Sequence, residues 1–251
     1  MNEFSVGRVL GTGFRIWFKN LIPFLLITLL IYVPLILWGY SIVHAEQELD
    51  LWLKGFDRFS KLTLGLIPLL NILVSAALTY GVVMELQGQH ASIGACIATG
   101  IRRFFPVLGV ALLTMICVIG GTIALVIPGI IVACMLYVTT QVAVLEGPGV
   151  MASLSRSREL TRGHRGQIFG VLLLLGILGW VVTKIIETTM LDPASITPDN
   201  VFSKLRMYMY VELARSVVIG SLGSVFAAVA YYFLRSEKEG TSAAELANVF
   251  E

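Results

Sequence analysis

The residues most able to do chemistry in this chain are the few charged side chains that border its long apolar segments. They are Glu85, Glu146, Lys184, Glu187, Glu212 and Arg215. A charge is costly to bury in lipid, so such residues mark ion paths, proton relays or structural ion pairs. No Asp, Glu or His lies at the middle of an apolar segment. The pattern therefore does not favour a proton-coupled transporter.

Two kinds of ion pair are expected from these charges. Glu85 and Glu146 close apolar segments at corresponding places, where each could pair with a basic residue of a neighbouring helix or stay solvated. The other four charges border two consecutive segments: Lys184, Glu187, Glu212 and Arg215. If these segments are antiparallel neighbours, salt bridges between them would pair all four charges. We expect this structural pairing rather than an ion path.

No catalytic, cofactor-binding or metal-binding constellation is found. The motif GSLGS (220–224) lacks the strand-to-helix context of a nucleophile elbow. The motif GTG (11–13) is too short for a phosphate-binding loop and has no lysine at the needed spacing. The histidines fall in predicted loops or interfacial helices: His44, His90 and His164. We predict that the protein is not an enzyme and uses no cofactor.

The cysteines indicate packing rather than redox or metal chemistry. Cys96, Cys117 and Cys134 are odd in number, and two of them lie inside apolar segments. Neither a disulfide framework nor a metal site fits this spacing. We interpret all three as small apolar packing residues.

Composition places these residues in an integral membrane protein, because 57% of residues are hydrophobic and 14% are charged. A spanning helix needs about 20 mostly apolar residues. Six segments qualify or nearly do: 21–43, 62–84, 104–127, 129–145, 168–191 and 211–234. They do not alternate with the period of two that a membrane barrel requires. The predicted fold is all-α with six transmembrane helices, although the third and fourth segments could instead form a re-entrant hairpin.

The chain also reads as one domain built from three pseudo-repeats. The units are residues 1–88, 89–149 and 150–240, followed by a short cytoplasmic tail at 241–251. Each unit has a basic, amphipathic cytoplasmic-side helix followed by a transmembrane hairpin. The joins look alike, as in RIWFKNLIPFLLI (15–27) and IRRFFPVLGVALL (101–113).

Basic residues fall mainly on one side of such a topology. The N-terminal side carries Arg8, Arg15, Lys19, Arg102, Arg103, Arg156, Arg158, Arg162, Arg165, Arg235 and Lys238. The opposite side carries Lys54, Arg58, Lys61, Lys204 and Arg206. Since basic residues are enriched in cytoplasmic loops, we predict that both termini are cytoplasmic.

Eight of these basic residues are candidates for contact with anionic headgroups or a protein partner: Arg8, Arg15, Lys19, Arg102, Arg103, Arg158, Arg162 and Arg165. The first helix could lie in the headgroup plane or pack on the protein's own cytoplasmic surface. The spacing of Arg158, Arg162 and Arg165 predicts one face of a single helix. Nucleic-acid binding is not expected.

Small residues in the last apolar segment predict close helix packing. Ser216, Gly220, Ser224 and Ala228 recur at four-residue spacing, which lets helix backbones approach in lipid. We expect this helix near the centre of the bundle and against the fifth segment. A homo-oligomer interface is the competing use of the same residues.

Three stretches together resemble a known family. They are VIPGI (127–131), AVLEGPGVMASLSRSRELTRGHRGQIFGVLLLL (143–175) and AAVAYYFLRSEKEG (227–240). They resemble bacterial membrane proteins similar to the membrane domain of some glycerophosphodiester phosphodiesterases. The catalytic barrel of those enzymes has no counterpart here, so their hydrolase activity is not implied. The resemblance implies a six-helix protein of the bacterial cytoplasmic membrane.

The sequence therefore favours a non-catalytic protein of the bacterial inner membrane that acts as a scaffold, a regulator or a lipid-contacting subunit. Its expected partners are membrane lipids with anionic headgroups on the cytoplasmic face, and a protein partner or a second copy of the chain. The alternative is a transporter or channel for a small or lipidic solute, with a pathway among the first, second and sixth segments.

Overall fold

The structure is a computed structural model that describes residues 4–43, 49–190 and 201–240. Within these residues every regular element is an α-helix. The helices are α1 (Val6–Lys19), α2 (Leu21–Val43), α3 (Leu49–Leu86), α4 (Ile93–Arg102), α5 (Phe104–Ala124), α6 (Val126–Met135), α7 (Thr139–Leu145), α8 (Val150–Leu160), α9 (Arg165–Met190) and α10 (Val201–Glu239). The tail predicted at 241–251 lies outside the described residues.

Six apolar stretches of helix are long enough to cross a bilayer, which confirms the all-α class and the number of long apolar elements. They are Leu21–Ser41, Gly65–Leu86, Phe104–Ala124, Val126–Leu145, Arg165–Thr189 and Ser203–Glu239. The first matches its prediction closely, because a run from residue 21 to residue 43 without a single charge has no other stable state in lipid. The protein is therefore a multi-pass membrane protein by the length and composition of its helices.

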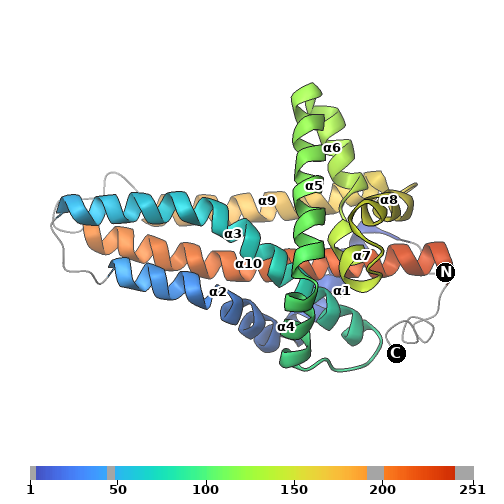
Figure 1. Cartoon of the computed structure of the whole chain (residues 1–251), viewed down its shortest axis with the longest axis horizontal. Helices are drawn as coiled ribbons and strands as arrows, with labels where there is room; N and C mark the ends of the chain where they lie inside the picture. Colours follow the sequence, from blue (N-terminus) through green and yellow to red (C-terminus); the bar gives the residue numbers. More distant parts are fainter. Residues whose placement is uncertain (1–3, 44–48, 191–200, 241–251) are drawn as a thin grey trace.

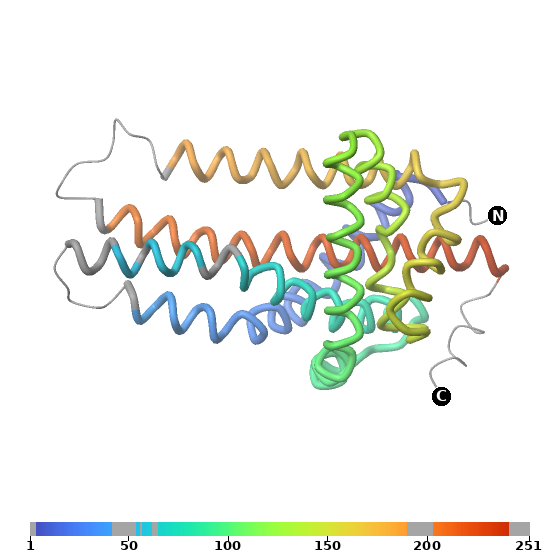
Figure 2. The backbone as a smooth tube through the Cα atoms, turned by 45° about the horizontal axis from the view of Figure 1, so that its top comes forward, coloured from blue at the N-terminus to red at the C-terminus, as the bar shows by residue number. Residues whose placement is uncertain are grey.

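The long helices do not all run in one direction. α2, α3, α9 and α10 lie lengthwise in the molecule, whereas α5 and α6 form a hairpin that runs across them (Figure 1). The same crossing is seen after a 45° turn of the view (Figure 2). The hairpin turns at Leu125, where Gly121 packs against the backbone of Gly129.

α10 is the central helix of the lengthwise set. In its 18-residue apolar window 61% of residues are buried, against 11% in the corresponding windows of α5 and α9. α10 packs most extensively against α3 and also contacts α1 and α2. The small and medium residues from Ser224 to Ala230 are all buried there, so the core follows the second half of α10.

α1 packs on the protein itself, which is one of the two arrangements open from the sequence. Val9, Gly13, Ile16 and Trp17 are buried, and the Trp17 Nε1–H donates a hydrogen bond of 3.0 Å to Ser221 Oγ on α10. A Cβ at Gly13 would lie 2.5 Å from the ring of Phe226, so only glycine permits this approach. The basic side chains of α1 are left on its exposed face.

Two predicted helices are broken. The fourth apolar segment is divided into α6 and α7 by a turn at residues 136–138. The helix expected to carry Arg158, Arg162 and Arg165 on one face is also divided, and that prediction is wrong. α8 ends at Leu160, Gly163 takes a φ of +96°, and α9 begins at Arg165. The left-handed backbone at Gly163 redirects the chain, so the three arginines do not share one helix face.

Candidate functional site

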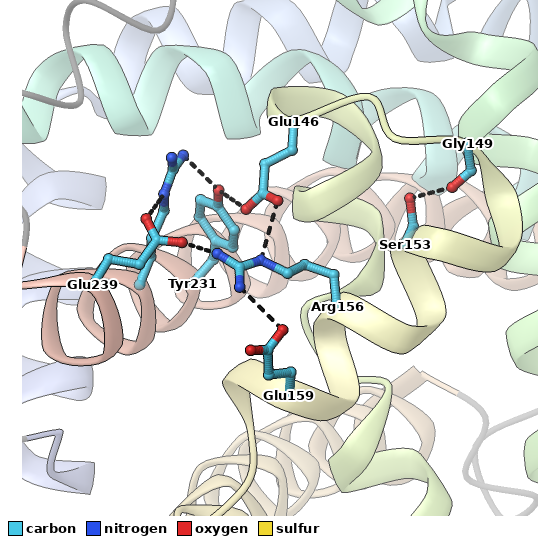
Figure 3. A network of polar contacts seen from close by, with 8 residues as sticks. Glu146, Gly149, Ser153, Arg156, Glu159, Tyr231 and Glu239 are labelled. Atoms are coloured by element: carbon cyan, nitrogen blue, oxygen red, sulfur yellow. Dashed lines mark hydrogen bonds and ion pairs between the residues drawn. The ribbon is translucent and has the colours of Figure 1, made fainter.

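The densest polar cluster of the described residues lies where α7, α8 and α10 meet, and Arg156 is at its centre (Figure 3). The Arg156 guanidinium donates through Nε to Glu146 Oε2 at 3.2 Å and through Nη1 to Glu159 Oε2 at 3.1 Å. It also forms an ion pair with Glu239 near the end of α10. Three carboxylates therefore surround one arginine.

Residues of α10 extend this cluster into a closed network (Figure 3). Tyr231 Oη donates to Glu146 Oε1 at 2.7 Å and accepts from Arg235 Nη1 at 3.0 Å. Arg235 Nε in turn donates to Glu239 Oε2 at 2.8 Å. We call Glu146, Arg156, Tyr231, Arg235 and Glu239 the α8–α10 network.

Local sequence explains why these side chains meet. Tyr231, Arg235 and Glu239 are spaced by four residues, which places them on one face of α10. Gly147 and Gly149 have φ values of +61° and +96°, and this turn folds α8 back beside the end of α7. Ser153 Oγ then donates to the Gly149 carbonyl at 2.7 Å, in addition to the Ser153 N–H that bonds the same carbonyl at 3.0 Å.

α8 is also held by the break between α6 and α7. The Met135 carbonyl loses its usual helical partner, because the N–H of Thr139 bonds Leu136 instead. The Ser157 hydroxyl donates to the Met135 carbonyl at 2.9 Å, and the Thr161 hydroxyl donates to it at 3.2 Å. Both hydroxyls belong to buried residues of the α8 end, so they serve the backbone and are not placed as nucleophiles.

The neighbouring carboxylates of the network stabilise the charged form of Arg156. Burial would lower the pKa of the Arg156 guanidinium, but the charges of Glu146 and Glu159 outweigh it and raise the pKa above its ordinary value. Because the pKa of Arg156 is higher in the folded protein than in the unfolded chain, its charge stabilises the fold at every pH below the ordinary arginine pKa. This stabilisation would be lost only if the pH rose through the raised pKa of the folded protein. Arg156 therefore stays charged at every pH at which the protein is handled.

Glu85 forms a second, smaller cluster. It pairs with Lys19 of α1 through Nζ–Oε1 at 2.5 Å and lies 3.1 Å from His90 Nδ1. The Glu85 side chain is 8% exposed, whereas Lys19 is 62% exposed. Each carboxylate singled out in the sequence thus faces a basic residue of a short neighbouring helix. Glu85 faces Lys19 of α1, and Glu146 faces Arg156 of α8.

The four charges that border the last two apolar segments pair within their own helices, which corrects the expected salt bridges between helices. Lys184 Nζ lies 2.7 Å from Glu187 Oε2 on α9, and Arg215 pairs with Glu212 on α10. Residues three apart on a helix are already neighbours, so each pair closes locally.

The small residues of α10 pack inside the chain. Ser216, Ser224 and Ala228 are buried, and a Cβ at Gly220 would lie 2.4 Å from Asn71 Oδ1 on α3. α10 contacts α9, the helix of the fifth segment, but it packs more extensively against α3. A stripe that is already buried is also not available as a homo-oligomer interface.

Three buried polar atoms near this contact have no hydrogen-bond partner: Tyr32 Oη, Asn71 Oδ1 and Ser216 Oγ. Tyr32 lies close enough to Asn71 and Arg215 to interact with both. The three atoms belong to α2, α3 and α10. Unpaired polar groups in a buried place favour bound water or a polar solute.

The basic candidates occupy the same end of the molecule as the α8–α10 network. Arg8, Arg15, Lys19, Arg102, Arg158 and Arg162 are exposed, and Arg103 and Arg165 are half-buried. Arg103 packs its guanidinium against Gly147, whose added Cβ would lie 2.7 Å from Arg103 Nη1.

The site is built for ion pairing and structure. No group of three His, Cys, Asp or Glu residues within the described ranges could hold a metal ion. Cys96 and Cys134 are buried, and burial raises the pKa of the Cys96 thiol to about 11, so it is a poor nucleophile. Sequence reasoning singled out Glu146 but missed Tyr231, Arg235 and Glu239, although their four-residue spacing was visible.

Fold and site together define a multi-pass helical membrane protein with a closed ion network at one end. Residues 59–234 match a family described as a domain of unknown function, DUF7847. The match spans more than half of the chain, and the chain belongs to this family. No curated protein and no solved structure matches the chain. The resemblance to phosphodiesterase membrane domains stays a prediction.

Proposed function

We propose that this protein is a non-catalytic scaffold or lipid-contacting subunit of the bacterial inner membrane, with its basic end in the cytoplasm. The observation that carries the proposal is the charge balance at that end. Glu85, Glu146 and Glu239 are each paired with cations, and Glu237 accepts from the Phe4 N–H and lies 3.1 Å from His164. The acids are thus occupied within the fold, while several arginines remain exposed.

Such a surface attracts anionic lipid. Each basic residue near a negatively charged leaflet contributes about 1 kcal/mol of attraction at physiological ionic strength. Arg102, Arg158 and Arg162 are exposed on α4, α8 and the turn after α8. The proposal includes the three-repeat reading, in which α1, α4 and α8 are the short helices that open each unit.

We further propose that α2, α3, α9 and α10 span the bilayer and that the α5–α6 hairpin lies along it. Helices that run across one another cannot all be parallel to the normal of one flat bilayer, so the two sets cannot both cross it upright (Figure 2). The hairpin tip supports this orientation, because Leu125, Val126 and Ile127 are 65–71% exposed and none is polar. A tip that emerged into water would expose these side chains at a cost of roughly 1.5–3 kcal/mol each.

A charge-reversal experiment tests the lipid contact. The triple variant Arg102→Glu, Arg158→Glu, Arg162→Glu is extracted with its surrounding lipid by a styrene–maleic acid polymer. The wild-type chain should retain at least twofold more phosphatidylglycerol than the bulk membrane holds, and the variant should lose this enrichment. The matched control reverses Lys54, Arg58 and Lys61 at the opposite end and should retain it. Equal enrichment in all three proteins would refute the proposal.

A transporter or channel is the second candidate, and the unpaired polar atoms of Tyr32, Asn71 and Ser216 favour it. They lie on α2, α3 and α10, the three helices on which the sequence placed a pathway. The test is the uptake of small polar solutes by proteoliposomes that contain the protein. Uptake by the wild-type chain that is abolished in Asn71→Leu would support the transporter over the scaffold.

A further inference from the structure

An apolar groove of about 430 Å³ opens between α6 and α9, where the hairpin crosses the lengthwise helices (Figure 1). Its lining includes Ile130 and Ala133 of α6 and Phe169, Leu173, Gly176 and Trp180 of α9. Both helices belong to apolar stretches of membrane-spanning length, so the groove opens toward lipid rather than water. Its contents are therefore hydrocarbon.

A basic residue, Arg165, lies one helical turn before Phe169, the first α9 residue of the groove lining. Arg165 precedes Phe169 by four residues, which places the two side chains on the same face of α9. The charge of Arg165 also acts on Cys134, the neighbour of the groove residue Ala133 on α6. Arg165 is thus the basic residue at the head of the groove.

The guanidinium of Arg165 is incompletely satisfied. Its Nε is buried and has no hydrogen-bond partner in the structure. A buried donor left without an acceptor costs about 1–3 kcal/mol, more for a charged group. Arginine matches the geometry of phosphate, whose oxygens accept two parallel N–H bonds. The missing acceptor is thus of the kind that a phospholipid headgroup supplies.

The length of the groove fits one lipid chain. From Phe169 to Trp180, α9 rises by roughly 17 Å at 1.5 Å per residue. Half of a bilayer hydrocarbon core is about 15 Å thick. An acyl chain that begins beside Phe169, one turn below the phosphate on Arg165, would therefore reach the middle of the bilayer near Trp180.

We propose that the α6–α9 groove binds one anionic phospholipid, with its phosphate on Arg165 and one acyl chain along Phe169, Gly176 and Trp180. The inference rests on the proposed lipid-contacting function but deepens it. A discrete site holds one molecule, whereas the exposed arginines attract the leaflet diffusely.

Four single variants of the full chain test the site. Arg165→Gln removes the phosphate contact, and Lys238→Gln removes an exposed basic residue of α10, outside the charge-reversal set, as its control. Gly176→Leu fills the groove, since a Cβ there meets nothing within 4 Å and the side chain can be accommodated. Gly179→Leu is the matched control, because it is equally open but lies outside the groove lining.

Each purified variant is mixed in detergent with phosphatidylglycerol or phosphatidylcholine of identical chains, and bound lipid is counted by native mass spectrometry. The wild-type protein should retain one phosphatidylglycerol in preference to phosphatidylcholine. Arg165→Gln should weaken the binding of phosphatidylglycerol at least tenfold and abolish the preference over phosphatidylcholine. Gly176→Leu should weaken the binding of both lipids. Both controls should behave as wild type.

The outcomes separate this site from the broader proposal. Equal losses in Lys238→Gln and Arg165→Gln would overturn the discrete site and leave the diffuse attraction standing. Wild-type retention by Arg165→Gln would overturn it as well, and so would wild-type retention by Gly176→Leu. A selective loss in Arg165→Gln would support the site even if the charge-reversal variant kept its lipid enrichment.

Discussion

Arg156 shows how a single residue holds three elements together. Its guanidinium contacts Glu146 at the end of α7, Glu159 on α8 and Glu239 on α10. The side chain is 24% exposed, so water screens part of each attraction. Removing it leaves Glu146 with the Tyr231 hydroxyl and no cation, while Glu239 keeps its ion pair with Arg235. A half-buried carboxylate without a cation costs more than an exposed salt bridge gains.

We expect Arg156→Ala to lower the free energy of unfolding by about 1–3 kcal/mol, measured as thermal unfolding in detergent. Glu159→Gln is the control, because Glu159 is 69% exposed and its loss should cost less than about 0.5 kcal/mol. Arg156→Lys should recover only part of the stability, since an ammonium cannot reach several carboxylates with planar geometry. An Arg156→Ala variant as stable as wild type would show that the network is not structural.

At the scale of elements, the packing of α10 on α3 depends on glycine at one register. Gly220 meets Asn71 Oδ1, while Gly223, three residues further on, meets nothing within 4 Å of an added Cβ. The two positions share one helix, so they separate the effect of contact from the effect of helix propensity.

Gly220→Ala should destabilise the protein by about 1–2 kcal/mol, because the new methyl group displaces the Asn71 amide in a packed interface. Gly223→Ala should be neutral or stabilising by up to about 1 kcal/mol, as alanine is the better helix former. Denaturant or thermal unfolding of both variants gives the comparison. The same shift in both would mean that the α3–α10 contact does not depend on Gly220.

The elements were largely predictable from sequence, and their breaks and crossings were not. α2 follows from a charge-free run, and Glu146 stood out as a charge at the edge of such a run. Hydropathy identifies apolar segments but says nothing about the angles between helices, so the crosswise orientation of α5 and α6 could not be predicted from it. The helical spacing of Arg158, Arg162 and Arg165 predicted one continuous helix. The glycine between them, Gly163, takes a positive φ and separates α8 from α9. Tyr231 and Glu239 gained their roles only through the turn that brings α8 to α10.

At the scale of the whole molecule, the orientation of the α5–α6 hairpin decides how many times the chain crosses the membrane. No charged residue occurs between Arg103 and Glu146. If the hairpin crosses, Leu125 emerges on the outer face. If it lies along the bilayer, Leu125 remains in lipid.

Leu125→Cys in a cysteine-free chain (Cys96→Ala, Cys117→Ala, Cys134→Ala) should resist a membrane-impermeant maleimide added outside intact cells. Leu125 is 69% exposed on the protein, so the protein itself does not shield it from the reagent. Lys61→Cys at the opposite end, where Lys61 is exposed, should react from outside and serves as the positive control. Rapid labelling of Leu125→Cys from outside would establish a hairpin that crosses.

The carbonyl of Met135 has a consequence for biosynthesis. It is released by the break between α6 and α7 and accepts hydrogen bonds only from Ser157 and Thr161, more than twenty residues later in the chain. Until those residues have left the ribosome, the broken helix has no internal donor for this carbonyl, and an unpaired carbonyl is costly in lipid. α6 and α7 therefore reach their final form only after α8 has been synthesised, so this part of the protein matures as one late unit rather than hairpin by hairpin.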